Sequence, residues 1–233
     1  MVDFHSHILP DMDDGSPDEL TSLEMLRESA RQGIKTIAAT SHFYADRTTP
    51  SLFLSKRENR AQRLFEACQG EQSELPEIRL GAEVSYFEGM SAAEELNDLC
   101  IEGTNLLLVE MPFCPWTKRM TGEIRLINDR RGLIPIIAHL DRYIPIEGKD
   151  LFRHFEDKEV LIQVNADGFI GKRTLKILLN MLKFGIIDVL GSDCHNMDSR
   201  RPDIMDAMDI IRKKLGVQAV EDLTAASERI ITG

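Results

Sequence analysis

The chain lacks paired cysteines, long apolar segments and an excess of positive charge. Its four cysteines form no C-x-x-C pair, and no apolar run reaches the length that crosses a bilayer. No basic, apolar leader precedes the first apolar run, so we expect a reduced, cytoplasmic protein without membrane insertion. A net charge of −11 disfavours nucleic acid as a partner. An anionic substrate would therefore need a local reversal of the field, from metal ions or buried arginines.

A glycine-rich phosphate loop is also missing after the first apolar run, which argues against an open, doubly wound nucleotide-binding sheet. Seven short, mostly apolar runs alternate with helical segments, a pattern typical of a parallel sheet covered by helices. The predicted strands are 2–7, 34–40, 78–82, 106–109, 134–138, 160–164 and 188–191. With 233 residues and no strong linker, we expect one α/β domain over 1–233, a closed or nearly closed β/α barrel, with the open sheet as the alternative.

The helices are predicted from apolar periodicity and capping residues. Ser16 is the expected N-cap of the first helix, with Pro17 at N1 and Glu19 at N3, and Gly33 ends it. Further helices are expected over 51–69, 91–99, 119–131, 151–157, 175–184 and 204–215, and from Glu221 onward.

Histidines and carboxylates follow most of the predicted strands. They are His5 and His7, His42, Glu83, Glu110, His139, and Asp193 with His195, while Asp14 lies in the loop after the first strand. Five of the six histidines belong to this set, and only His154 lies outside it. Because the carboxyl ends of barrel strands converge on one face, we expect all nine side chains to lie there.

This set predicts a metal centre more strongly than any single member does. One such residue alone is most often a solvated polar side chain or a helix cap. Four carboxylates packed against five imidazoles would repel one another and be poorly solvated without cations. Nine donors are too many for one ion, and three ions with bridging carboxylates fit the count. Strand alternation turns Cys194 away, and the remaining donor types favour manganese, iron or zinc.

The motifs around these residues resemble those of the PHP (polymerase and histidinol phosphatase) superfamily. Within it, the chain is most similar to the manganese-dependent protein-tyrosine phosphatases that regulate bacterial capsule and exopolysaccharide synthesis. The motifs are FHSHILPDMDDG (4–15), TSH (40–42), GAE (81–83), VEMPF (109–113), AHLDR (138–142) and SDCHN (192–196) with Arg200. The resemblance covers nearly the whole chain and implies a single distorted (β/α)7 barrel that holds three divalent ions, manganese being the expected one.

The resemblance also implies how the nine ligands are shared. One ion would take His5, His7, Glu83 and Asp193. Glu83 would bridge to a second ion, which Glu110 and His139 complete. The third would take Asp14, His42 and His195.

The implied activity is that of a phosphoric monoester hydrolase acting on phosphotyrosine in proteins. A hydroxide bridging two metals would attack phosphorus in line, while Arg142 and Arg200 hold phosphate oxygens. The implied partner is the phosphorylated tail of a bacterial tyrosine kinase. The general acid stays open, as does the choice between substrate contact and loop packing for Phe43, Tyr44, Phe113 and Trp116.

Other functions fit the sequence less well. A phosphatase for a small metabolite such as histidinol phosphate could use the same centre, and a non-catalytic metal-binding module would need the same ligands. A nuclease role fits poorly with a pI near 5.1. Cys194 and Arg200 have the C-x5-R spacing of cysteine-dependent phosphatases, but no glycine lies between them and Asp198 stands where the anion would bind.

Overall fold

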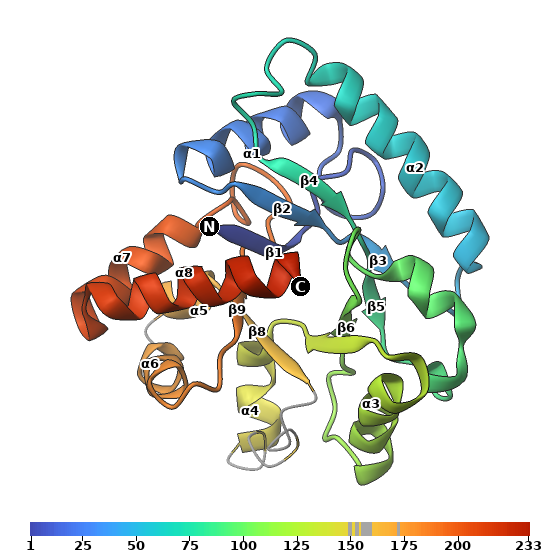
Figure 1. The fold of residues 1–233 in the computed structure, drawn as a ribbon, viewed down its shortest axis with the longest axis vertical. Coiled ribbons are helices and arrows are strands. Elements are labelled where there is room, and N and C mark those ends of the chain that lie inside the picture. The colour runs from blue at the N-terminus through green and yellow to red at the C-terminus, as the bar shows by residue number, and fades with distance from the viewer. Residues whose placement is uncertain (149–150, 152–153, 155–159, 172) are drawn as a thin grey trace.

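The computed structural model describes residues 1–148, 151, 154, 160–171 and 173–233. Short parallel strands alternate with helices along these residues, and Figure 1 shows the helices arranged around the outside of a strongly curled sheet. The predicted α/β class is therefore confirmed. The helix expected over 151–157 falls mainly on residues outside the described ranges. Among the described helices, none combines the length and the apolar character that a membrane span requires.

The described strands form two hydrogen-bonded sets, and within each set the neighbouring strands run parallel. One set has the order β1-β2-β4, and the other has the order β3-β5-β6-β7-β8-β9. The strands are β1 Val2–Ser6, β2 Thr36–Ala39, β3 His42–Phe43, β4 Glu77–Leu80, β5 Glu83–Ser85, β6 Leu106–Glu110, β7 Ile134–Ile137, β8 Leu161–Asn165 and β9 Val189–Gly191.

The second and third predicted strands form as β2 and β4, and each is followed by a further short strand that was not predicted. Between β2 and β3, and between β4 and β5, two residues leave the regular ladder. The Glu83 N–H lies 3.1 Å from both the Thr40 and the Ser41 carbonyl oxygens, and pairing resumes there in the register of β2 and β4, with His42 opposite Glu83. His42 and Glu83 consequently begin short strands instead of following long ones, but they still lie beyond the apolar part of each run.

The end of β1 lies beside the chain that follows β9. Ser6 and Cys194 form a parallel bridge, the His7 N–H donates to the Cys194 carbonyl at 2.9 Å, and the Asp193 N–H donates to the His5 carbonyl at 2.7 Å. The first and last strands in sequence are thereby brought together, and their polar ends share one location.

The described helices are α1 Glu19–Arg31, α2 Pro50–Ala67, α3 Lys118–Arg131, α4 Ile144–Glu147, α5 Asp167–Ile170, α6 Leu175–Lys183, α7 Ile204–Leu215 and α8 Val217–Thr232, with 3-10 turns η1 Met90–Ala92, η2 Glu94–Leu99 and η3 Leu140–Tyr143. The helices predicted over 51–69, 119–131, 175–184 and 204–215 form within two residues of those bounds, whereas the segment predicted over 91–99 forms two 3-10 turns, and α4, α5 and η3 were not predicted. The predicted Ser16 cap is wrong: Asp18 caps α1 by accepting from the Thr21 N–H at 2.8 Å. The Ser16 hydroxyl instead donates to the Asp18 carbonyl. The last helix begins at Val217, directly after Gly216, and not at Glu221.

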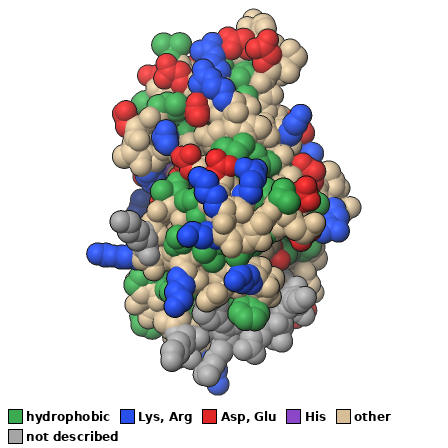
Figure 2. Space-filling model, turned by 90° about the vertical axis from the view of Figure 1, so that its left-hand side faces the viewer, with side chains coloured by type: hydrophobic (Ala, Val, Ile, Leu, Met, Phe, Trp, Pro, Cys, Tyr) green, Lys and Arg blue, Asp and Glu red, His purple; other side chains and the backbone are tan. Residues whose placement is uncertain are grey.

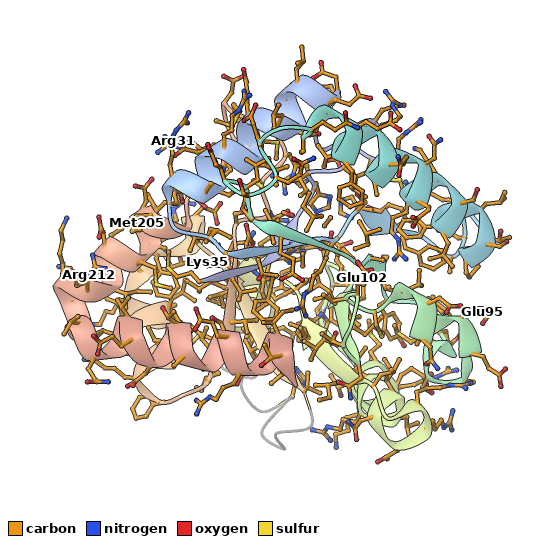
Figure 3. The ribbon with its side chains drawn as sticks, turned by 45° about the horizontal axis from the view of Figure 1, so that its top comes forward. Arg31, Lys35, Glu95, Glu102, Met205 and Arg212 are labelled. Atoms are coloured by element: carbon orange, nitrogen blue, oxygen red, sulfur yellow. The ribbon has the colours of Figure 1, made fainter. Side chains whose placement is uncertain are left out.

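Buried side chains alternate between the two faces of the sheet. In β6, Leu106 and Leu108 belong to a cluster with Phe4, whereas Leu107 and Val109 pack in the larger cluster that includes Ile124 of α3. Strands buried on both faces explain why the runs read as continuously apolar. Figure 3 shows side chains filling the space between sheet and helices, while the labelled Arg31, Glu95 and Arg212 point outward.

Acidic and basic side chains are interspersed on the face seen in Figure 2, and no histidine is visible on it. That side of the molecule carries α7 and α8. The polar cluster described below therefore opens elsewhere.

Candidate metal centre

Two histidines at the end of β1 form the middle of a polar cluster. The Nε2 atoms of His5 and His7 lie 3.1 Å apart. Glu83 Oε2 is 3.3 Å from the first and 3.4 Å from the second, and Asp193 Oδ1 is 3.5 and 3.4 Å from them. All four side chains are buried. The two imidazoles therefore lie on the same side of β1, and two nitrogens and two carboxylate oxygens face a common point.

Glu83 joins this group to a second one. Its Oε1 is 2.9 Å from His139 Nε2, which in turn lies 3.5 Å from Glu110 Oε1. His42 Nδ1 lies 2.8 Å from Glu83 Oε2, and donor atoms of His42, Glu83 and Glu110 all lie within 4.8 Å of one another. Glu83 therefore has the central position that a bridging carboxylate requires.

A third group lies toward the solvent. Asp14 Oδ1 is 3.4 Å from His42 Nε2 and 3.5 Å from His195 Nε2. His7 brings a further donor within 4.8 Å of these three. Asp14 is 66% exposed, so this group forms the mouth of the cluster. The nine residues singled out from the sequence are thus brought together, and their roles as ligands remain predictions.

Two of these residues have backbone conformations that favour glycine. His139 has φ of 35° and Asp193 has φ of 51°. Non-glycine residues rarely adopt positive φ, and such strain persists where the surrounding structure holds it. It directs both side chains into the cluster immediately after β7 and β9.

Charge within the cluster sets its protonation. Burial would raise the pKa of Glu83, but His5, His139 and His42 hold that pKa well below the usual range. Burial would lower the pKa of His139, yet Glu110 and Glu83 raise it to about 9. Burial, with the neighbouring His7 and Arg200, lowers the pKa of His195 to about 4. Glu83 is therefore anionic, and His139 holds a proton that a bound cation would displace.

Asp13, which the sequence analysis did not single out, orients two of the histidines. Its Oδ2 is 2.8 Å from His7 Nδ1 and accepts the His42 N–H at 2.9 Å, while its Oδ1 accepts the Gly15 N–H at 3.0 Å. Holding the second ring nitrogen of a ligand histidine is a common task for a carboxylate beside a metal. The sequence signal for Asp13 was the Asp13-Asp14-Gly15 turn, in which the prediction assigned a role to Asp14 alone.

Polar side chains of β8 form a second supporting layer that was also missed. Gln163 Oε1 accepts the His139 N–H at 2.6 Å and lies 3.3 Å from His5 Nδ1. Gln163 donates to Asn165 Oδ1 at 3.0 Å, and Asn165 donates to Asp193 Oδ2 at 2.9 Å. Two polar residues at alternate positions in an otherwise apolar run were the sequence signal.

The two predicted phosphate-binding arginines both contact Asp193. Arg142 pairs with Oδ2, and Arg200 Nη2 lies 2.8 Å from Oδ1. Arg200 Nη1 is also 4.0 Å from Asp14. About a third of each arginine side chain is exposed, so both guanidinium groups lie at the mouth of the cluster.

Cys194 is completely buried, and burial followed by the charge of Asp3 raises the pKa of its thiol well above the usual value. A buried thiol that resists ionisation cannot serve as the nucleophile of the C-x5-R mechanism. Cys194 belongs to the larger apolar cluster, which agrees with the expectation that it points away from the polar one.

The residues present fit divalent ions. His195 Nε2 is buried without a hydrogen-bond partner within the described part of the chain, and Glu83 Oε2 faces nitrogens of His42, His5 and His7 at 2.8 to 3.4 Å. Imidazole nitrogens and carboxylate oxygens converge there at 3.1 to 3.5 Å, an arrangement of electron-pair donors that a bound cation would satisfy. Imidazole and carboxylate donors without thiolate suit manganese, iron or zinc.

Comparison with known proteins agrees with this geometry. The model of the family described as capsular polysaccharide synthesis, CpsB/CapC, matches residues 1–232. The chain belongs to this family. The resemblance to a capsule-synthesis family is thereby confirmed.

Individual relatives of this CpsB/CapC-family chain are similar over nearly their full length. Tyrosine-protein phosphatase YwqE of Bacillus subtilis (strain 168) is 30% identical, over 99% of this chain and 91% of that protein. Tyrosine-protein phosphatase CpsB of Streptococcus pneumoniae is 29% identical, over 99% and 98% respectively. A solved structure from work on YwqE and CpsB, which describes them as unique metal-dependent tyrosine phosphatases, has a TM-score of 0.84 and 26% identity, covering 100% of this chain and 95% of that one.

Proposed function

We propose that this chain is a metal-dependent protein-tyrosine phosphatase. The observation that carries the proposal is the buried cluster of histidines and carboxylates with two partly exposed arginines at its mouth. The names of its relatives point to the same activity. A cluster that can hold several cations reverses the local field of a −11 protein, as a phosphomonoester dianion requires.

We infer that the nine side chains hold three divalent ions, with manganese expected and iron or zinc as alternatives. His5, His7, Glu83 and Asp193 would hold the first. Glu83, Glu110 and His139 would hold the second, and Asp14, His42 and His195 the third. His7 would bind the first ion, yet it also has a donor atom within 4.8 Å of donor atoms of the third group. This short distance supports a centre in which the first and third ions lie close together.

The protein's own contribution is binding and orientation. Divalent ions would supply Lewis-acid stabilisation of the transferring phosphoryl group and make water a nucleophile at neutral pH. Arg142 and Arg200 bind the equatorial phosphate oxygens, since guanidinium groups pair with phosphate in two-point contacts. Asp13 and Gln163 hold the ligand histidines in place, so little reorganisation is needed when substrate binds.

We further propose that residues 1–233 form one domain whose strands close into a distorted (β/α)7 barrel. Two features support this proposal: the contact between β1 and the chain after β9, and the continuation of β2 into β3 and of β4 into β5. The proposed substrate is a phosphotyrosine protein, the tail of a bacterial tyrosine kinase, met in the cytoplasm.

The test starts from protein freed of metal with a chelator. Samples reloaded with manganese, iron or zinc are assayed on a phosphotyrosine peptide, histidinol phosphate and a phosphodiester. We expect chelation to abolish turnover, manganese to restore it, and the phosphotyrosine peptide to have the highest kcat/KM.

Each competing function has its own outcome in this assay. A preference for histidinol phosphate would favour the small-metabolite phosphatase. Activity confined to the phosphodiester, or turnover unaffected by chelation, would refute the proposal. Bound metal without turnover of any substrate would favour the non-catalytic module.

A further inference from the structure

Phe113 is a large apolar side chain that stays exposed beside the candidate metal centre. Phe113 lies in the loop that follows β6, and its side chain is 55% exposed. Its ring stacks on that of His139, with centroids 6.0 Å apart and planes at 15°. His139 Nε2 is 2.9 Å from Glu83, so the Phe113 ring borders the place where the metal-binding donors meet.

A packed ring beneath it and hydrogen bonds of the surrounding loop hold the Phe113 ring in place. It stacks on Tyr143 with centroids 5.0 Å apart, and the buried Tyr143 hydroxyl donates to the Met111 carbonyl at 2.6 Å. After Phe113, the Trp116 indole N–H donates to the Pro112 carbonyl at 3.1 Å. The loop therefore presents an ordered aromatic ring to solvent, which costs free energy unless a ligand covers it.

The other aromatic side chains around the centre offer no comparable surface. Phe43 is buried against Phe53, and Trp116 is buried against Tyr143. Tyr44 lies near His42, with ring centroids 5.3 Å apart, and the Arg47 guanidinium lies 4.2 Å from its centroid. Of the four loop aromatics singled out from the sequence, Phe113 alone has a largely free surface.

We propose that Phe113 stacks against the aromatic ring of the phosphorylated substrate and so selects aryl over alkyl phosphomonoesters. The proposal rests on the proposed phosphatase function and adds a specificity-determining residue to it. A phosphate held by Arg142 and Arg200 would place its ester group over the same cluster that the Phe113 ring borders. Two aromatic rings pack favourably with centroids about 4.5–7 Å apart.

The binding test uses two unreactive ligands, benzylphosphonate and ethylphosphonate, which share the phosphonate but differ in the ring. Calorimetry on the manganese-loaded full chain gives the ratio of their dissociation constants. In Phe113→Leu we expect the preference for benzylphosphonate to fall about fivefold to tenfold, as for the loss of one aromatic pair. Phe113→Tyr should retain the preference. Phe184→Leu, an 80% exposed phenylalanine just after α6, is the matched control and should also retain it.

Turnover provides a second readout. The ratio of kcat/KM for a phosphotyrosine peptide to that for acetyl phosphate should fall about tenfold in Phe113→Leu, mainly through KM. Acetyl phosphate has a good leaving group but no ring, so the ratio separates ring contact from leaving-group chemistry.

An equal loss of both phosphonates would mean that Phe113 acts by supporting His139, and would overturn the proposal. An unchanged preference would overturn it as well. Wild-type protein that binds neither phosphonate and hydrolyses neither substrate would refute the proposed function itself, and this inference with it.

Discussion

Asp13 holds the ring of His7 from the side opposite the cluster. We expect Asp13→Asn to weaken manganese affinity about 10- to 100-fold, because losing a carboxylate partner frees the imidazole to rotate and lowers its basicity. The measurement is a manganese titration by calorimetry. Asp11→Asn is the control, since Asp11 lies in the same loop but pairs with Arg60. Equal affinities for wild type and Asp13→Asn would contradict this role.

Arg200 and its neighbour Arg201 form a matched pair for testing phosphate binding. Arg200→Lys should lower kcat/KM for a phosphotyrosine peptide about 10- to 100-fold, because an ammonium cannot reproduce a two-point guanidinium contact. Arg201→Lys should leave it within about twofold, since Arg201 pairs with Asp206 on α7, away from the cluster. Steady-state kinetics at saturating manganese gives both values, and a similar loss in the two variants would argue against a specific role for Arg200.

Asp203 predicts a pH dependence of stability. Burial, with the nearby charges of Asp167 and Asp3, raises its pKa to about 8, against about 3.9 for an unfolded chain. Between these values the folded protein binds more protons than the unfolded chain, so the contribution of Asp203 to stability falls as pH rises from about 4 to 8. Asp203→Asn should therefore raise the free energy of unfolding by roughly 1–3 kcal/mol at pH 8 and by much less at pH 4.

Urea unfolding at both pH values measures the difference between wild type and variant. Asp209→Asn, at a half-exposed position in α7 that pairs with Arg212, is the control and should show no such change. A gain from Asp203→Asn that is the same at pH 4 and pH 8 would refute the interpretation.

At the scale of elements, the close approach of β9 to β1 depends on Gly191. A Cβ at this position would lie 2.5 Å from His5 Cβ and 2.7 Å from Gln163 Nε2, so Gly191→Ala must displace a candidate ligand or its support. We expect a loss of roughly 1–3 kcal/mol in stability together with weaker manganese binding.

Gly122 in α3 provides the opposite case, because a Cβ there would meet nothing within 4 Å. Gly122→Ala should stabilise the fold by roughly 0.5–1 kcal/mol. Thermal unfolding and manganese titration of both variants test the contrast. If Gly191→Ala behaved like Gly122→Ala, β1 and β9 would not be packed as described.

The elements were predictable where local signals act alone. The continuous apolar run at 106–109 predicts a strand, and β6 forms there. The amphipathic pattern at 204–215 predicts a helix, and α7 forms there. The breaks after Ala39 and Leu80 were not predictable, because pairing across strands and not the run itself decides where a ladder is interrupted. The start of α1 was misjudged because the Ser16 hydroxyl donates within the preceding loop, leaving the cap to Asp18.

At the scale of the whole molecule, the gathering of the nine polar residues followed from topology. Parallel strands with histidines and carboxylates at their carboxyl ends must bring them together, whatever the exact strand limits. The supporting residues could not be found in this way. Asp13 and Gln163 act through contacts 29 and 24 residues away, to His42 and His139, which only the folded chain reveals.

The central claim is that these nine side chains hold three divalent ions. The most direct measurement is the manganese content of the protein after equilibrium dialysis, determined by elemental analysis, for wild type and Glu83→Gln. We predict three manganese ions per wild-type chain at saturation and a loss of more than one in Glu83→Gln, because Glu83 lies between two groups of donors. Less than one bound ion per wild-type chain, or an unchanged content in Glu83→Gln, would contradict the account.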